Sequence, residues 1–278
     1  MAISRASQSG EKAVVHQFNY VKPKSLAEAQ SVVKANEEAK ILSGGMTLIP
    51  TLKARLAQPT HLVDVSGLAE LKGITVTNDS VTVGAATRHV DVATSSEVKK
   101  AIPALAYLAG LIGDPQVRNL GTMGGSLANN DPAADYPSAT LGLGATIVTD
   151  RREIAADDYF QGLFSTALEP GELVMRIRFP IPLDAAYEKF PHPASGYAMC
   201  GAFVAVFANG IRIAITGAGG GVFRWAEAEK SLNAKRDVAP LATLPLDDSD
   251  FSEDIHATRE YRANLVRVIT KRAVLKLK

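Results

Sequence analysis

The sequence predicts a mixed α+β fold, with helices and sheets in several units along the chain. Three observations predict this class. Residues 14–67 alternate strand-like and helix-like segments in a βαβ-like order. Two pairs of alternating apolar segments meet at Asn78-Asp79 and at Asn209-Gly210, which is the pattern of β-hairpins. The last residues of the chain have the apolar periodicity of a helix. A length of 278 residues allows more than one domain.

The first unit is expected from about Val14 to Gly67. Its patterns predict a strand, a helix, a strand, a helix and a strand, in residues 13–21, 25–38, 39–45, 51–57 and 60–68. Ser25 and Glu28 have the spacing of a capping box, which predicts where the first helix starts. The second helix is expected beyond Pro50.

The second unit is expected over residues 68–180. Its patterns predict a hairpin, two helices and two stretches of strand, in residues 73–85, 87–100, 102–112, 144–160 and 172–182. Between them, residues 114–137 read DPQVRNLGTMGGSLANNDPAADYP and are predicted to form one long loop. A loop of this length inside a compact domain is usually functional.

Pro180 and Pro182 mark the expected linker to a third unit. Beyond them, the patterns predict a long hairpin and two helices, in residues 197–218, 226–232 and 260–277. At the other end of the chain, the polar residues 1–13 are expected to form a flexible leader.

Composition excludes several classes of protein. The 30 Lys and Arg residues nearly balance 29 Asp and Glu, so nothing indicates a nucleic-acid partner. The single cysteine, Cys200, makes neither an internal disulfide nor an iron–sulfur cluster site. The N-terminus lacks the apolar core of a secretory signal, and no apolar run approaches the roughly 18 residues of a membrane span. We therefore expect a cytoplasmic protein.

Two glycine pairs interrupt apolar runs in nearly the same way. Residues 42–49 read LSGGMTLI, and residues 120–131 read LGTMGGSLANND. Glycine allows φ > 0 and lets a ligand approach the main chain, and successive N–H groups exposed there attract anions. Neighbouring serine and threonine hydroxyls add further donors. The residues alone leave two interpretations open: ordinary tight turns, or two loops that grip one long, doubly charged ligand such as a dinucleotide.

The other motifs in the sequence give little indication of function. Residues 216–222, TGAGGGV, lack the third glycine of a dinucleotide fingerprint and are predicted to form a turn. The five histidines show no metal-ligand spacing, and neither a nucleophile elbow nor a P-loop occurs. Redox chemistry performed by a bound organic cofactor fits this profile.

Four segments carry a resemblance to a known family: LSGGMTLIPTLKARLAQPTHLVDV, DPQVRNLGTMGGSLANNDPAADYPS, TALEPGELV and YEKFPHPASGYAMCGAFVAV. Together they resemble the FAD-binding medium subunits of molybdenum hydroxylases, and among these the aerobic carbon monoxide dehydrogenase type. The resemblance implies a two-lobed FAD-binding domain of the vanillyl-alcohol-oxidase (PCMH) type at residues 14–180, with lobes at about 14–67 and 68–180. It also implies a smaller C-terminal α/β domain at residues 181–278, with an antiparallel sheet and helices.

The resemblance further implies which residues bind FAD. The two glycine loops are expected to bind the pyrophosphate from both sides, through Ser43, Gly44, Gly45, Met46, Thr47, Thr122, Met123, Gly124, Gly125 and Ser126. Asp135 falls where the family contacts the polar chain of the flavin, and Leu168 where an apolar residue packs on the isoalloxazine ring. Lys189 matches a lysine that approaches the flavin, and Tyr197 an aromatic residue that faces the ring.

Each of these transfers has a structural alternative. Asp135 can instead cap a helix that starts at Tyr136, Lys189 can be a solvated lysine, and Tyr197 can be a core residue. Two positions depart from the family. Met46 stands where the carbon monoxide enzymes commonly carry a histidine, and Gly196 stands where a charged residue usually precedes the tyrosine. The departures put carbon monoxide as the substrate in doubt, but not FAD binding.

The resemblance implies the flavin subunit of a three-component enzyme. A large molybdopterin subunit oxidises the substrate, a small subunit with two [2Fe–2S] clusters relays the electrons to FAD, and the flavin passes them to an external acceptor. This chain then has no catalytic residue for the substrate and no metal of its own. Two alternatives stay open: a stand-alone FAD-dependent oxidase or reductase of the same fold, and a non-catalytic flavoprotein scaffold.

Overall fold

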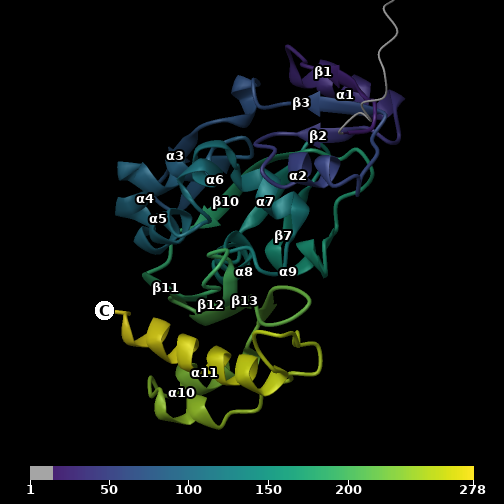
Figure 1. Cartoon of the computed structure of the whole chain (residues 1–278). Coiled ribbons are helices and arrows are strands. Elements are labelled where there is room, and N and C mark those ends of the chain that lie inside the picture. The colour runs from purple at the N-terminus through teal and green to yellow at the C-terminus, as the bar shows by residue number, and fades with distance from the viewer. Residues whose placement is uncertain (1–14) are drawn as a thin grey trace, which may run out of the picture.

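A computed structural model describes residues 15–278 of the chain. The leader expected at residues 1–13 lies outside the described residues. The elements near the N-terminus lie at one end of the molecule and the C-terminal helices at the other, with a layer of helices and sheets between them (Figure 1). This mixture of helices and sheets confirms the predicted class.

The first unit contains a three-stranded parallel sheet of order β1-β3-β2. Its strands and helices are β1 (Asn19–Val21), α1 (Leu26–Ala35), β2 (Lys40–Leu42), α2 (Leu48–Lys53) and β3 (His61–Asp64). The order of elements follows the prediction. Helix α2 starts before Pro50, not beyond it. The N–H groups in the first turn of a helix have no acceptor within the helix, so a proline, which has no N–H, is tolerated there.

The predicted cap of α1 is confirmed. The Ser25 hydroxyl accepts a hydrogen bond from the Glu28 N–H at 3.2 Å. The Glu28 carboxylate accepts one from the Lys24 N–H at 2.7 Å, one residue before the capping position. Ala29 and Val33 then form the buried stripe of the helix.

The second unit contains a five-stranded antiparallel sheet of order β4-β5-β10-β6-β7. Its strands are β4 (Ile74–Val76), β5 (Ser80–Gly84), β6 (Thr146–Thr149), β7 (Glu153–Ala155) and β10 (Val174–Pro180). A short 3-10 helix, Ala69–Leu71, leads into it. After β7 come the helical turn α9 (Ala156–Tyr159) and a two-stranded hairpin, β8 (Phe160–Gly162) and β9 (Ser165–Thr166).

Six helices fill the chain between β5 and β6: α3 (His89–Thr94), α4 (Ser96–Ala101), α5 (Pro103–Gly110), α6 (Pro115–Leu120), α7 (Met123–Asn129) and α8 (Tyr136–Gly142). The prediction of one long loop at residues 114–137 is therefore wrong. Asp114 and Thr122 each cap a helix: the Asp114 carboxylate accepts from the Val117 N–H at 2.8 Å, and the Thr122 hydroxyl accepts from the Gly125 N–H at 3.3 Å.

The third unit is a four-stranded antiparallel sheet of order β11-β12-β13-β14, with two helices on one face. Its elements are β11 (Asp184–Pro191), β12 (Ala198–Phe207), β13 (Gly210–Thr216), β14 (Phe223–Arg224), α10 (Ala226–Ala234), the 3-10 helix Ala239–Ala242 and α11 (Arg259–Leu275). The predicted hairpin is confirmed, although its two loop residues are Ala208 and Asn209. The turn predicted at residues 216–222 begins at Thr216, the last residue of β13, and the residues after it bend toward β14, with an isolated bridge between Gly219 and Phe251; no helix follows them directly. Strand β11 was not expected.

Strand β12 is buried along nearly its whole length because both faces of its sheet are covered. Phe203 and Ala205 belong to the large core that also contains the antiparallel sheet and α8. Val204 and Val206 belong to the core beneath α10 and α11. On α8, Gly142 lies so close to Phe203 that an added Cβ would be 3.1 Å from the ring. The core thus continues across the linker expected at Pro180 and Pro182.

None of the helices in residues 15–278 combines the length and the apolar character needed to cross a membrane.

We predict that Phe203→Ala lowers the free energy of unfolding by about 3–5 kcal/mol, because it leaves a cavity between the C-terminal sheet and α8. Phe164→Ala is the matched control. Its ring is 57% exposed, so the change should stay within roughly 0.5 kcal/mol. Urea unfolding followed by circular dichroism measures both. Similar losses in the two variants would contradict this packing.

Candidate functional site

A cavity of about 490 Å³ lies where the two glycine segments meet. Its size is that of a typical cofactor pocket. All of the predicted site residues except Met123 and Lys189 line it: Ser43, Gly44, Gly45, Met46, Thr47, Thr122, Gly124, Gly125, Ser126, Asp135, Leu168 and Tyr197. Met123 is fully buried in the core. The structure therefore brings together residues from all four segments that carry the family resemblance.

The two glycine segments touch through their backbones. A Cβ on Gly44 would lie 2.2 Å from the carbonyl oxygen of Leu120 and 2.7 Å from the Cα of Gly121, so no side chain fits. Beside this contact, the Thr122 hydroxyl donates to the Ser43 hydroxyl at 3.1 Å. The absence of a Cβ at Gly44 thus serves the approach of the second segment, rather than the approach of a ligand.

The other glycines differ in their roles. Gly45 has φ +72°, the left-handed conformation that glycine favours. Gly124 and Gly125 lie in the first turn of α7, so the freedom to take φ > 0 is not needed there. A Cβ on Gly124 would lie 2.5 Å from the Cβ of Ala85. A Cβ on Gly125 would have only the Thr122 hydroxyl within 4 Å, at 2.9 Å, so Gly125 keeps cavity space free.

A buried ion pair stands at the Asp135 end of the cavity. The Lys189 ammonium donates to the Asp135 carboxylate at 2.9 Å and to the Leu111 carbonyl at 3.1 Å, and both charged side chains are 4% exposed. The Tyr187 hydroxyl donates to the other carboxylate oxygen. Burial and the nearby carboxylate raise the pKa of Tyr187 well above its ordinary value, so the hydroxyl keeps its proton.

These contacts decide two of the alternatives. Lys189 is not a solvated lysine, and it reaches the cavity wall through Asp135. Asp135 occupies the capping position of α8, yet its side chain makes no capping hydrogen bond, because the carboxylate faces Lys189 and Tyr187. Tyr197 is 45% exposed, so it is not a core residue.

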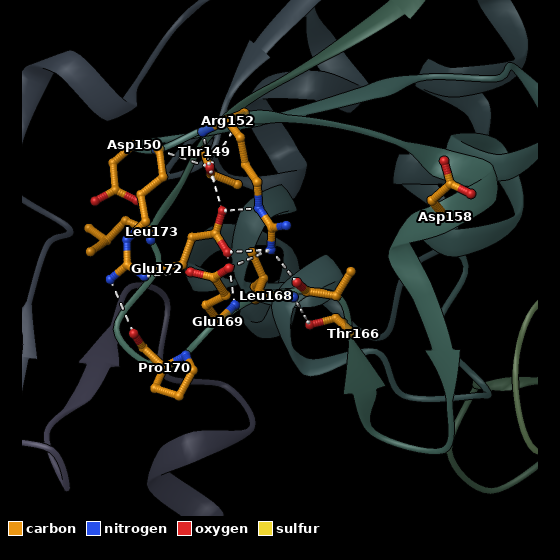
Figure 2. A network of polar contacts seen from close by, with 12 residues as sticks. Thr149, Asp150, Arg152, Asp158, Thr166, Leu168, Glu169, Pro170, Glu172 and Leu173 are labelled. Carbon is orange, nitrogen blue, oxygen red and sulfur yellow. Dashed lines mark hydrogen bonds and ion pairs between the residues drawn. The ribbon is translucent and has the colours of Figure 1, made fainter.

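Glu172 lines the cavity near Leu168, and reasoning from the sequence missed it. Figure 2 shows its carboxylate facing the Arg152 guanidinium. It accepts hydrogen bonds from Arg152 Nε and Nη2 at 3.1 and 3.0 Å, from the Thr149 hydroxyl at 2.7 Å and from the Glu169 N–H at 2.8 Å. Burial works against the charged form, but these bonds hold the pKa of Glu172 at about 2.

His89 is a second lining residue that reasoning from the sequence missed. It lies behind the second glycine segment: a Cβ on Gly121 would be 2.6 Å from its Nε2 atom. Its ring packs edge-on against Tyr136, with 5.2 Å between the ring centroids. Burial, helped by the charge of Arg118, lowers the pKa of His89 to about 4, so the ring is neutral near pH 7. We assign His89 a packing role beside the second glycine segment.

Neither a cysteine nucleophile nor a group of metal ligands is found at the site within the described residues. Cys200 is buried, and burial raises its pKa to about 12, so its thiol is not an exposed nucleophile. In the described part of the chain, no group of three or more His, Cys, Asp or Glu side chains is placed to hold a metal ion.

Comparisons with known proteins agree with the geometry. The family model described as "FAD binding domain in molybdopterin dehydrogenase" matches residues 16–182. The glyceraldehyde dehydrogenase medium chain of Sulfolobus acidocaldarius is 34% identical, over 92% of this chain and 97% of its own length. Among solved structures, carbon monoxide dehydrogenase from Hydrogenophaga pseudoflava has a TM-score of 0.85 at 34% identity, over 94% of this chain and 97% of its own. Quinoline 2-oxidoreductase from Pseudomonas putida 86 has a TM-score of 0.86 at 30% identity, with the same coverage. The chain therefore belongs to the family of FAD-binding domains of molybdopterin dehydrogenases, and its cofactor is FAD.

Proposed function

We propose that this chain is the flavin subunit of a multi-subunit molybdenum hydroxylase. In this proposal it takes electrons from the [2Fe–2S] clusters of a small partner subunit and passes them to an external acceptor, while a large molybdopterin subunit oxidises the substrate. The observation that carries the proposal is the cavity between the two joined glycine segments, in a chain that matches medium chains over nearly its full length. The two-lobed PCMH-type division at residues 14–67 and 68–180 is part of the proposal.

The residues of the cavity fit FAD. The first segment offers backbone N–H groups and the Thr47 hydroxyl for a pyrophosphate. In the second segment the N–H groups of Met123 to Ser126 already donate within the protein, so this segment offers the Ser126 hydroxyl and the space that Gly125 leaves beside it. Asp135 lies where the polar chain of the cofactor would run, and Leu168 and Tyr197 where its ring would lie. FAD, when bound, supplies reversible electron transfer. The chain itself binds the cofactor, orients it and sets the charge around it.

The partners are proposed from the relatives. Several relatives are described as medium chains or as FAD-binding subunits of larger enzymes, including carbon monoxide and xanthine dehydrogenases. The substrate of the large subunit is left unassigned. Met46 lines the cavity at the position where the carbon monoxide enzymes commonly carry a histidine, and its backbone N–H can still donate.

A stand-alone oxidase would need a free acid or base at the cavity. Asp135 is paired with Lys189, and Glu172 with Arg152. The other titratable residues that line the cavity are Asp131, whose carboxylate accepts a hydrogen bond from the Ala133 N–H at 2.9 Å, and Lys40, His89 and Tyr197, and such an oxidase would have to use one of these. The pairing of the two buried carboxylates therefore favours the subunit over the oxidase.

We predict that Gly125→Val weakens FAD binding at least about tenfold, because each charge-assisted hydrogen bond lost from the pyrophosphate removes roughly 1.5–3 kcal/mol. The apo chain should lose less thermal stability than with Gly44→Val, because the added Cβ meets the Thr122 hydroxyl at 2.9 Å, a side-chain group that can shift, and not a backbone carbonyl. Gly110→Val is the matched control, since a Cβ there has nothing within 4 Å and Gly110 lies outside the cavity. Titration with FAD, followed by flavin fluorescence, measures both variants.

Gly44→Val separates packing from binding. It places a side chain against the Leu120 carbonyl, so it should lower the unfolding temperature of the apo chain as well as FAD affinity. Retained flavin in Gly125→Val would show that the second segment does not hold the cofactor.

We predict that Lys189→Met lowers the reduction potential of the bound flavin. The change leaves the Asp135 carboxylate at the cavity wall without its cation, and added negative charge disfavours electron uptake. A cost on the order of 1 kcal/mol corresponds to roughly 20 mV for a two-electron couple. Spectroelectrochemistry measures the potential.

The double variant Lys189→Met, Asp135→Asn is the control, because it removes both charges and should bring the potential back toward that of the parent chain. It also removes the buried unpaired carboxylate that would destabilise the single variant. An unchanged potential in the single variant would show that the charge of Lys189 does not act on the flavin.

We predict that the isolated flavoprotein does not react with the substrate of its native complex. Its flavin should be bleached under anaerobic conditions only after the iron–sulfur and molybdenum subunits are added. The measurement is absorbance at the flavin band, with the chain alone and with the reconstituted complex. Bleaching of the chain alone at a rate that supports turnover would favour the oxidase, and no bleaching in an active complex would favour the scaffold.

A further inference from the structure

We propose that Glu172 is a positioning residue for the cofactor cavity. Through its bonds to Arg152 and to the Glu169 N–H, it holds residues 167–173 in the conformation that places Leu168 in the cavity wall. The inference rests on the proposed FAD site, since the effect on the cofactor passes through Leu168. Nothing in the sequence patterns distinguishes Glu172 from the exposed Glu169 three residues before it.

The backbone is fixed immediately before Leu168. Arg152 Nη2, which bonds the Glu172 carboxylate, also donates to the Ala167 carbonyl at 2.7 Å. The Ala167 N–H donates to the Tyr159 carbonyl at 2.8 Å. The residue that precedes Leu168 is thus held by both of its backbone polar groups.

The backbone is also fixed immediately after Leu168. The Glu169 N–H donates to the Glu172 carboxylate at 2.8 Å, and the Glu169 carbonyl accepts from the Glu172 N–H at 3.0 Å. Figure 2 shows Leu168 in the same segment as Glu169 and Glu172, with the bonds of Glu172 to Arg152 drawn beside it. Because both neighbours bond to the Glu172–Arg152 pair, the position of Leu168 depends on that pair.

A second set of contacts lies on the outside of the same segment and is less important. Arg151 bonds the Glu169 carboxylate and the Pro170 carbonyl, each at 3.1 Å, but both charged side chains are largely exposed. Ion pairs of this kind contribute little. The Glu172 side chain, in contrast, has no exposed surface, so water does not replace Arg152 and Thr149 as partners of its carboxylate if those two partners are lost.

The pair is arranged so that Glu172→Gln loosens the segment without leaving a buried charge. Arg152 is 43% exposed, and water can solvate its guanidinium when the carboxylate is gone. The glutamine amide, however, presents N–H donors toward Arg152 or toward the Glu169 N–H, both of which are donors themselves. The substituted chain should therefore fold, with residues 167–173 less well fixed.

The test compares Glu172→Gln with Glu153→Gln. Glu153 on β7 forms an ion pair at 2.7 Å with Arg178 on β10, across the intervening strand β6, but both side chains are exposed and lie outside the cavity. FAD affinity is measured by titration of the apo chain, together with the shape of the flavin absorption bands. Glu172→Gln should weaken FAD binding about tenfold, the size expected for groups coupled through contact, and should change the absorption bands. Glu153→Gln should stay within about twofold of the parent chain.

A double-mutant cycle with Leu168→Ala shows whether Glu172 acts through Leu168. In the Leu168→Ala background, Glu172→Gln should change FAD affinity by less than about twofold, because the side chain that it positions is gone. Equal effects in both backgrounds would overturn the inference, as would a Glu172→Gln chain with parental affinity and spectrum. A parent chain that binds no FAD, alone or with its partners, would refute the proposed function itself, so the two failures are distinguishable.

The arginine supplies a second variant in case Glu172→Gln does not fold. Arg152→Lys keeps the positive charge but cannot bond the carboxylate through two nitrogens while also bonding the Ala167 carbonyl. It should weaken FAD binding in the same direction and with the same dependence on Leu168. Parental affinity in Arg152→Lys would contradict the role assigned to the pair.

Discussion

The structure depends on a contact between two stretches of bare backbone. Gly44 lies directly on Leu120 and Gly121, where a Cβ would be 2.2 Å from a carbonyl oxygen. The hydrogen bond from Thr122 to Ser43 joins the same segments across 79 residues of sequence. One segment ends a strand of the parallel sheet, and the other leads into α7. The contact therefore brings two units of the fold to one cavity, and part of the glycine requirement belongs to the protein's own packing.

The third unit contributes Tyr197 to the cavity wall and is also joined to it by a buried ion pair. Lys189 and Tyr187 both lie on β11, and both bond Asp135 at the start of α8. The next strand makes room for this arrangement, because a Cβ on Gly201 would be 2.5 Å from the Tyr187 hydroxyl oxygen. A buried pair of this kind does little for stability, but removing one partner is costly, so the position of the C-terminal sheet and the charge state of the cavity wall are set together.

Short-range physics was predictable from the sequence, and contacts between distant residues were not. The Ser25 cap and the hairpins follow from neighbours in the chain, and they were predicted correctly. The prediction of a loop at residues 114–137 rests on their content of glycine, asparagine and proline, which hides two helix caps, at Asp114 and Thr122. Lys189 is bonded to a carboxylate 54 residues away in the sequence, and Glu172 to an arginine 20 residues away, so neither pairing is visible in the local sequence. The family resemblance predicted residues that line the cavity. The ion pairs Lys189–Asp135 and Arg152–Glu172 could be identified only from the three-dimensional structure.

These pairs have a common electrostatic consequence. An anionic cofactor gains from backbone N–H groups at the first glycine segment, but it would be repelled by an unpaired carboxylate buried in the same wall. Asp135 and Glu172 both belong to the residues of the cavity wall, and each has a buried carboxylate bonded to a cation, Lys189 or Arg152, that is not among the lining residues. The cations cancel the repulsion without competing for the cofactor's own contacts. The same bonds fix the start of α8 and residues 167–173, both of which contribute residues to the cavity wall. Charge neutrality and shape are therefore produced by the same two ion pairs, and a substitution in either pair should alter both properties together.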